Sequence, residues 1–198
     1  MDLKGKRIIL GSSSPRRREL LSGLNIDFTV DTLNCFDEHF SDGTPNDEVP
    51  RLMSEGKSHG FHRPLAEDEI LITADTMVIL PPSDGQPGEI LGKPRSREDA
   101  MRMLRDLSGR EHHVTTAVTL RSVSREETFS DTTEVWFKEL TEEEIAYYVD
   151  TFQPYDKAGA YAIQEWIGHI GITRIDGSYA NVVGFPIHRV YAALQHFI

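Results

Sequence analysis

The chain has 198 residues and a formal net charge of −11, and 38% of its residues are hydrophobic. A chain of this length can bury one sizeable core, so we expect a single domain over residues 1–198, with room for two lobes. The acidic balance argues against a protein that binds nucleic acid or an anionic membrane, because both tasks need a broad basic surface.

The single cysteine, Cys35, excludes an internal disulfide and a cysteine-based zinc site. Beside Phe36 we expect it to be a buried apolar residue. No apolar run approaches the ~20 residues of a membrane span, and the N-terminal residues lack the apolar segment of a signal peptide. We therefore expect a cytoplasmic protein.

The first part of the chain predicts short strands separated by helices. Apolar runs and helix-start signals place strands at 7–10 and 28–30, and helices at 15–22 and 47–59. Gly23 ends the first helix, and the second tolerates Pro50 only within its first turn. The residues between them, 31–46, are polar and irregular.

The middle of the chain contains the clearest strand signal, residues 70–80, followed by a turn at 81–85 and a return strand near 89–91. Ser96 caps the next helix, Gly109 ends it, and its apolar residues share one face: Ala100, Met103, Leu104 and Leu107. Two long strands, 113–121 and 126–137, form an antiparallel pair.

The last third begins with a capping box, Thr141 and Glu144, which opens a helix whose inward face carries Ile145, Tyr148 and Val149. Strands near 170–175 and 179–183 precede a final helix over 186–197. Because parallel crossovers and antiparallel pairs are both implied, the fold class is α/β with a mixed sheet.

An anion site is predicted where the first strand meets the first helix. Gly11, Ser12 and Ser14 are small, Ser14 is the expected N-cap, and Pro15 is the first helical residue. The unpaired N–H groups of a helix start attract anions, and Arg16 and Arg17 add two cations there. Two other interpretations remain open: a kinase-directed site in a basic tail, which the flanking apolar residues disfavour, and a capped helix without a ligand.

Asp75 interrupts the apolar run 70–80, where an unpaired carboxylate is unfavourable. In one interpretation it marks a bend or bulge and accepts hydrogen bonds from the Thr76 hydroxyl and from backbone N–H groups. In the other it is a metal ligand or general base at a strand end, facing the anion site. The second interpretation requires Arg16 and Arg17 to lie on the same side as Asp75.

Several other polar residues carry weaker signals when they are considered alone. Glu38 belongs to an acidic loop, Lys57 resembles a surface lysine, and Lys93 precedes a turn proline. Lys157 lies beside small residues, where a ligand can approach closely. Gln164 either pairs with the edge of a nucleobase through its amide or ends a strand. The histidines form no zinc motif, and we expect His112 and His113 to begin a strand.

The segment Leu10-Gly11-Ser12-x-Ser14-Pro15-Arg16-Arg17-x-Glu19-Leu20-Leu21 resembles the N-terminal signature of the Maf-like nucleoside triphosphate pyrophosphatases. Gly11 replaces the usual alanine of that signature. Further matches follow in family order along the chain: residues 51–57, Ala74-Asp75-Thr76, Leu91-Gly92-Lys93-Pro94, residues 156–161, and residues 177–186. The resemblance therefore covers essentially the whole chain.

The resemblance implies a mixed, twisted sheet flanked by helices, with two lobes around a central cleft, as in Maf and ITPase-like proteins. It implies that Asp75 is the catalytic base and that Glu38 helps with metal or water, so both would hold Mg²⁺ or Mn²⁺. The residues expected to bind the nucleoside triphosphate are Ser12, Ser14, Arg16, Arg17, Lys57, Thr76, Lys93, Lys157 and Gln164.

Within the family, Gln164 resembles the branch that hydrolyses dTTP and UTP to the monophosphate and pyrophosphate, removing unwanted or modified nucleotides. Glu165 departs from the usual glycine. The alternatives are therefore a pyrophosphatase acting on 7-methyl-GTP or on a broader set of modified nucleotides, and a nucleotide-binding regulator of division or septum formation. Arg16, Thr76 and Gln164 are the expected specificity positions, and the family suggests a homodimer.

Overall fold

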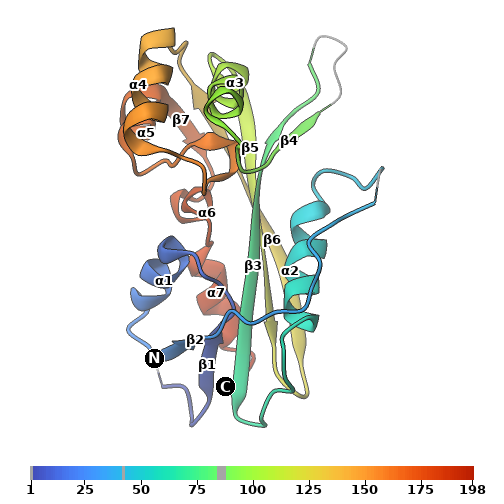
Figure 1. Ribbon diagram of the computed structural model, residues 1–198. Coiled ribbons are helices and arrows are strands. Elements are labelled where there is room, and N and C mark those ends of the chain that lie inside the picture. The colour runs from blue at the N-terminus through green and yellow to red at the C-terminus, as the bar shows by residue number, and fades with distance from the viewer. Residues whose placement is uncertain (1, 42, 84–87) are drawn as a thin grey trace. The chain divides into compact units, whose positions relative to one another are not determined.

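A mixed β-sheet is the central element of the protein (Figure 1). The structure is a computed structural model, and it describes residues 2–41, 43–83 and 88–198. Within these residues the strands are β1 (Arg7–Leu10), β2 (Phe28–Val30), β3 (Glu69–Leu80), β4 (Glu89–Leu91), β5 (Glu111–Arg121), β6 (Glu126–Phe137) and β7 (Ile172–Asp176). Asp84 and Gly85 of the predicted turn lie outside the described residues.

The order of the strands is β2-β1-β3-β5-β6-β7, and β4 pairs with β3. β1 runs parallel to β2 and β3, whereas the pairs β3–β4 and β6–β7 are antiparallel. β5 and β6 are neighbours joined by a short turn in which the Ser122 N–H donates to the Arg125 carbonyl over 2.8 Å. The predicted α/β class with a mixed sheet is confirmed.

The chain divides into two compact units. Unit one contains Met1–Asp75, Thr116–Asp131 and Gly184–Ile198, and unit two contains Thr76–Thr115 and Thr132–Val183. The long strands β3, β5 and β6 contribute residues to both units, whereas each described helix belongs to one unit.

Unit one carries helices on both faces of its strands (Figure 1). Helices α1 (Pro15–Ser22) and α7 (Ile187–Leu194) pack on one face, where the core includes Ile8, Leu10, Leu21, Ile70, Ile72, Val118, Phe185, Val190 and Leu194. Helix α2 (Val49–His59) covers the other face, where the buried Ser54 hydroxyl donates to the Thr73 carbonyl over 3.3 Å. Pro50 lies in the first turn of α2, as the prediction required.

Unit two buries its core beneath α3 (Arg97–Leu107), α4 (Glu142–Phe152) and α5 (Trp166–Gly171). Both predicted caps form. The Ser96 hydroxyl accepts the Asp99 N–H, and Thr141 and Glu144 make a reciprocal capping box. A short 3-10 turn, η1 (Ala158–Ala160), precedes α5 and was not predicted.

One predicted strand near the C-terminus is wrong, because residues Tyr179–Val183 form helix α6. The strand predicted near 170–175 is present as β7, which begins at Ile172 because Ile170 belongs to α5. The helical conformation places Asn181 in the interior, where its amide donates to the Val114 carbonyl over 2.9 Å. The Ser178 hydroxyl accepts the Asn181 N–H, which is an N-cap signal that outweighed the strand propensity of the two valines.

Cys35 is exposed, which corrects the expectation that it is buried. The neighbouring residue takes the inward position instead. A Cβ atom added at Gly56 of α2 would lie 2.2 Å from the Phe36 ring, so this ring packs directly against the helix backbone. Because successive side chains of an extended segment alternate in direction, Phe36 points inward and Cys35 points outward.

His112 is a buried histidine in the core of unit two. Its Nε2 lies 2.7 Å from the Tyr161 hydroxyl, and burial lowers its pKa from 6.5 to about 3. The unfolded chain therefore binds a proton between these two pH values that the folded chain does not, and the stability of the folded state falls as the pH falls through this range.

We expect His112→Gln to reduce the loss of stability between pH 6.5 and pH 5 by about 2 kcal/mol. Urea denaturation at the two pH values measures the difference, and the exposed His169→Gln provides the control. An unchanged pH dependence in His112→Gln would contradict the assignment of this titration to His112.

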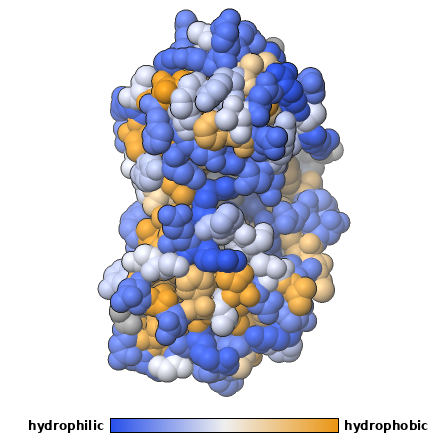
Figure 2. Space-filling view, turned by 60° about the vertical axis from the view of Figure 1, so that its left-hand side comes forward, coloured by the Kyte–Doolittle hydropathy of each residue, from blue (hydrophilic) through white to orange (hydrophobic). Residues whose placement is uncertain are grey.

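In the described part of the chain, no helix combines the length and apolar character needed to cross a bilayer. On the face drawn in Figure 2, hydrophobic residues form separate patches among hydrophilic ones.

Candidate active site

The junction between β1 and α1 forms as the sequence predicts. Ser14 is the N-cap of α1, its hydroxyl accepts the Arg17 N–H over 3.4 Å, and Pro15 begins the helix. The Ser12 hydroxyl accepts the Ser14 N–H over 3.3 Å. A Cβ atom at Gly11 would lie 2.9 Å from the Thr73 methyl group, so this chain favours glycine where the family signature has alanine.

Arg17 connects this junction to two other segments of unit one. Its Nε donates to the Gly184 carbonyl over 2.9 Å, and one terminal nitrogen donates to the Ala74 carbonyl over 2.8 Å and to the Ser12 hydroxyl over 3.2 Å. Burial lowers the pKa of Arg17, and the charge of Asp75 opposes that shift. Arg17 therefore lies near Asp75, which is one part of the requirement that the sequence interpretation placed on Arg16 and Arg17.

Arg16 is half-buried in the first turn of α1, and its positive charge acts on Arg17 in the direction that lowers the pKa of Arg17. Two like charges in one turn disfavour each other and oppose the helix dipole. An anion bound at this end of the helix would relieve both effects.

Asp75 is 8% exposed and lies within β3, which continues without a break to Leu80. It therefore marks neither a strand end nor a bend. Its Oδ1 accepts a hydrogen bond from Lys57 Nζ over 2.6 Å. Its Oδ2 is buried and has no hydrogen-bond partner among the described residues. A buried carboxylate oxygen without a partner is unfavourable, and it can be satisfied by a ligand or a water proton.

Lys57 joins two carboxylates in unit one. It lies in the last turn of α2, and its ammonium is 2.6 Å from Asp75 and 3.2 Å from Glu38 Oε2. The Glu38 side chain is 61% exposed, so this end of the group is open to solvent. Unit one thus brings together seven of the predicted residues: Ser12, Ser14, Arg16, Arg17, Glu38, Lys57 and Asp75.

The remaining predicted residues belong to unit two. Lys157 is buried, and its ammonium lies 2.8 Å from Asp156 and 3.3 Å from Glu165. Gln164 lies in a turn and does not end a strand, and its Oε1 is buried without a hydrogen-bond partner among the described residues. Thr76 is half-buried, and Lys93 is exposed after β4.

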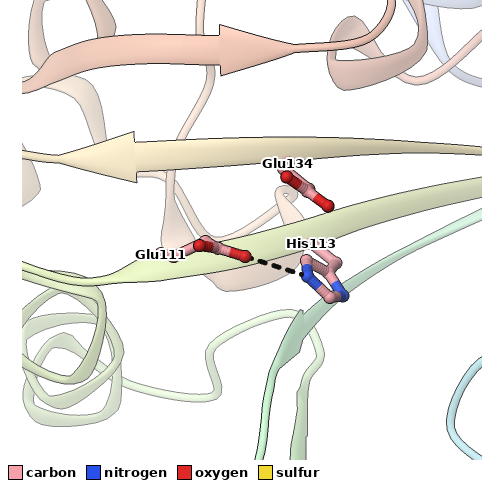
Figure 3. A group of neighbouring side chains, drawn as sticks. All are labelled: Glu111, His113 and Glu134. Carbon is pink, nitrogen blue, oxygen red and sulfur yellow. Dashed lines mark hydrogen bonds and ion pairs between the residues drawn. The ribbon is translucent and has the colours of Figure 1, made fainter.

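Sequence reasoning missed one group in unit two whose side chains could hold a metal ion. Glu111, His113 and Glu134 each offer a ligand atom, and these atoms lie within 4.8 Å of one another (Figure 3). The signal was present as Glu-x-His, because residues two apart on a strand share a face. His112 and His113 do lie at the start of a strand, as predicted.

Sequence comparison with known proteins matches the chain to one family. The family model described as "Maf-like protein" matches residues 7–197. The chain is 46% identical over 189 residues to a "dTTP/UTP pyrophosphatase" of Bacteroides thetaiotaomicron, covering 96% of this chain and 95% of that protein. It is 45% identical over 196 residues to a protein of the same name from Parabacteroides distasonis, covering 99% and 98% of the two chains.

A solved structure has a similar fold. The Ham1 protein of Staphylococcus aureus matches with a TM-score of 0.53 and 17% sequence identity, covering 98% of this chain and 100% of that one. At this identity the similarity shows the fold alone.

Proposed function

Because the chain belongs to the Maf family, we propose that it hydrolyses dTTP and UTP to the nucleoside monophosphate and pyrophosphate. The protein is a hydrolase that acts on the anhydride bonds of nucleoside triphosphates. The observation that carries the chemistry is the buried Asp75 carboxylate, which pairs with Lys57 through one oxygen and keeps the other oxygen without a partner among the described residues.

The cations of unit one are suited to a triphosphate. We assign Ser12, Ser14 and the N–H groups at the start of α1 to phosphate oxygens, together with Arg16 and Lys57. The Arg17 guanidinium already donates to two carbonyl groups. We therefore assign to Arg17 mainly an electrostatic contribution from inside unit one, without direct contact with the phosphates. Guanidinium and ammonium groups stabilise the charge that develops on the leaving pyrophosphate.

The other substrate-binding residues that the family resemblance implies belong to unit two. We assign Lys93 and Lys157 to the phosphates and Thr76 and Gln164 to the nucleoside. The buried Oε1 of Gln164 supports its assignment, because an acceptor without a partner can receive the N–H of a pyrimidine base.

In the proposed reaction, Asp75 accepts a proton from a water molecule as the water oxygen attacks the α-phosphorus. The bond between the α-phosphorus and the bridging oxygen breaks, and pyrophosphate leaves with that oxygen. Lys57 holds one Asp75 oxygen at 2.6 Å, which fixes the direction of the other. The mechanism needs no covalent intermediate.

The donor set of unit one fits a hard divalent cation. Mg²⁺ and Mn²⁺ prefer oxygen ligands, and Asp75 Oδ2 is a buried oxygen without a partner among the described residues. Asp75 and Glu38 would hold the ion together with phosphate oxygens, and the bound ion would neutralise phosphate charge and lower the pKa of water.

A panel of nucleoside triphosphates with Mg²⁺ or Mn²⁺ tests the proposal. We expect stoichiometric pyrophosphate with dTMP or UMP from the canonical pyrimidine substrates. Preferential release of 7-methyl-GMP would instead assign the chain to the other enzymatic branch. Tight binding without turnover would identify a nucleotide-binding regulator and contradict the proposal.

A further inference from the structure

Lys157 in unit two is a buried cation paired with two carboxylates of different exposure. Its side chain is 9% exposed, and its Nζ lies 2.8 Å from Asp156 Oδ1 and 3.3 Å from Glu165 Oε1. The Asp156 side chain is 57% exposed, whereas that of Glu165 is 25% exposed. Glu165 is therefore the more confined of the two partners.

Glu165 is also anchored from the opposite side. The Tyr148 hydroxyl, on the fully buried inner face of α4, donates to Glu165 Oε2 over 2.5 Å. Burial raises the pKa of Tyr148, and the bond to Glu165 raises it further, so the hydroxyl keeps the proton that it donates. Each oxygen of Glu165 thus has its own partner, one from Tyr148 and one from Lys157.

Glu165 is the N-cap of α5, a position from which a side chain can accept a hydrogen bond from a backbone N–H at the start of the helix. The Glu165 side chain makes no such hydrogen bond. The carboxylate is directed instead toward Tyr148 and Lys157. The adjacent Gln164 keeps a buried acceptor, Oε1, without a partner among the described residues. The Glu165 carboxylate therefore has polar partners within unit two, whereas Gln164 Oε1 has none among the described residues.

We propose that Glu165 is a positioning residue that holds the Lys157 ammonium for the triphosphate and does not contact the base. This inference rests on the proposed function. An ammonium group has three N–H donors, and one of them donates to Asp156 Oδ1. Glu165 Oε1 forms an ion pair with the ammonium at 3.3 Å. A remaining donor is available for a phosphate oxygen, and the Tyr148–Glu165 pair limits the positions that the ammonium can take.

A double-mutant cycle between Glu165 and Lys157 tests the inference. The variants are Glu165→Gln, which keeps the size and the acceptor for Tyr148, together with Lys157→Ala and the double variant. We expect Glu165→Gln to lower kcat/KM for dTTP by about 10-fold, mainly through KM, because it removes the charged partner that orients the ammonium. In the Lys157→Ala background we expect the same change to cost less than about 2-fold.

Two further variants separate positioning from folding. Glu165→Asp keeps the charge and should recover part of the KM effect, while Glu142→Gln, which breaks an exposed pair with Arg105, is the matched control and should leave kinetics unchanged. Thermal denaturation of each variant shows whether it is folded.

The outcomes distinguish the inference from the function on which it rests. Equal losses from Glu165→Gln in both backgrounds, or an unchanged or higher kcat/KM, would overturn the inference while the proposed function stands. A changed ratio of dTTP to 7-methyl-GTP turnover in Glu165→Gln would show that Glu165 reads the base, and would overturn it as well. A wild-type protein that releases no pyrophosphate from any nucleotide would overturn the function and the inference together.

Discussion

Asp75→Asn is expected to lower kcat for dTTP by about 10²- to 10³-fold, the usual contribution of a general base. The amide has nearly the same shape as the carboxylate and can still accept the hydrogen bond from Lys57. It cannot take a proton from water, and it binds a divalent cation poorly. Pyrophosphate release measures the loss, and calorimetry with a non-hydrolysable triphosphate should show that nucleotide still binds.

A matched control is available in the same unit. Asp68 is an exposed carboxylate paired with Arg7, and Asp68→Asn should leave kcat unchanged. If Asp75→Asn retains the wild-type rate, Asp75 is not the base. If it fails to bind nucleotide while remaining folded, its role lies in substrate binding rather than in proton transfer.

Arg17→Lys is expected to destabilise the protein by about 2–4 kcal/mol, because a buried hydrogen-bonded network loses partners whose polar groups stay buried. The guanidinium of Arg17 reaches Gly184, Ala74 and Ser12 at once. A lysine ammonium is a single point of charge and cannot span these acceptors. Urea denaturation measures the change in the free energy of unfolding.

Arg18→Lys, on the exposed side of the same helix, is the control and should change the free energy of unfolding by less than about 0.5 kcal/mol. Equal stability of Arg17→Lys and Arg18→Lys would show that the contacts of Arg17 are dispensable for folding. In that case Arg17 would act on the substrate rather than within unit one.

Local signals predicted most of the fold. The strand, N-cap and helix around Ser14 follow from adjacent residues, so β1 and α1 form at the predicted positions. Where a prediction from local sequence was wrong, tertiary interactions determined the conformation. Residues Tyr179–Val183 contain β-branched valines, yet they form a helix that carries Asn181 to buried acceptors. Cys35 is exposed because Phe36 takes the space against Gly56, a contact between distant residues.

The candidate site was predictable where residue type alone constrains the chemistry. A carboxylate in an apolar strand needs a partner, and Asp75 has one in Lys57. The sequence alone did not identify Lys57 as this partner, because Lys57 and Asp75 are 18 positions apart and lie on different elements. The role of Glu165 was hidden for the same reason, since its partner Tyr148 resembles any other core residue on the inner face of a helix.

The most direct test of the account is phosphorus NMR of the wild-type protein with dTTP and Mg²⁺ in water enriched with oxygen-18. We expect dTMP and pyrophosphate in equal amounts, with the heavy oxygen in dTMP, because Asp75 directs water to the α-phosphorus. The appearance of dTDP and orthophosphate, or of the heavy oxygen in pyrophosphate, would contradict that chemistry.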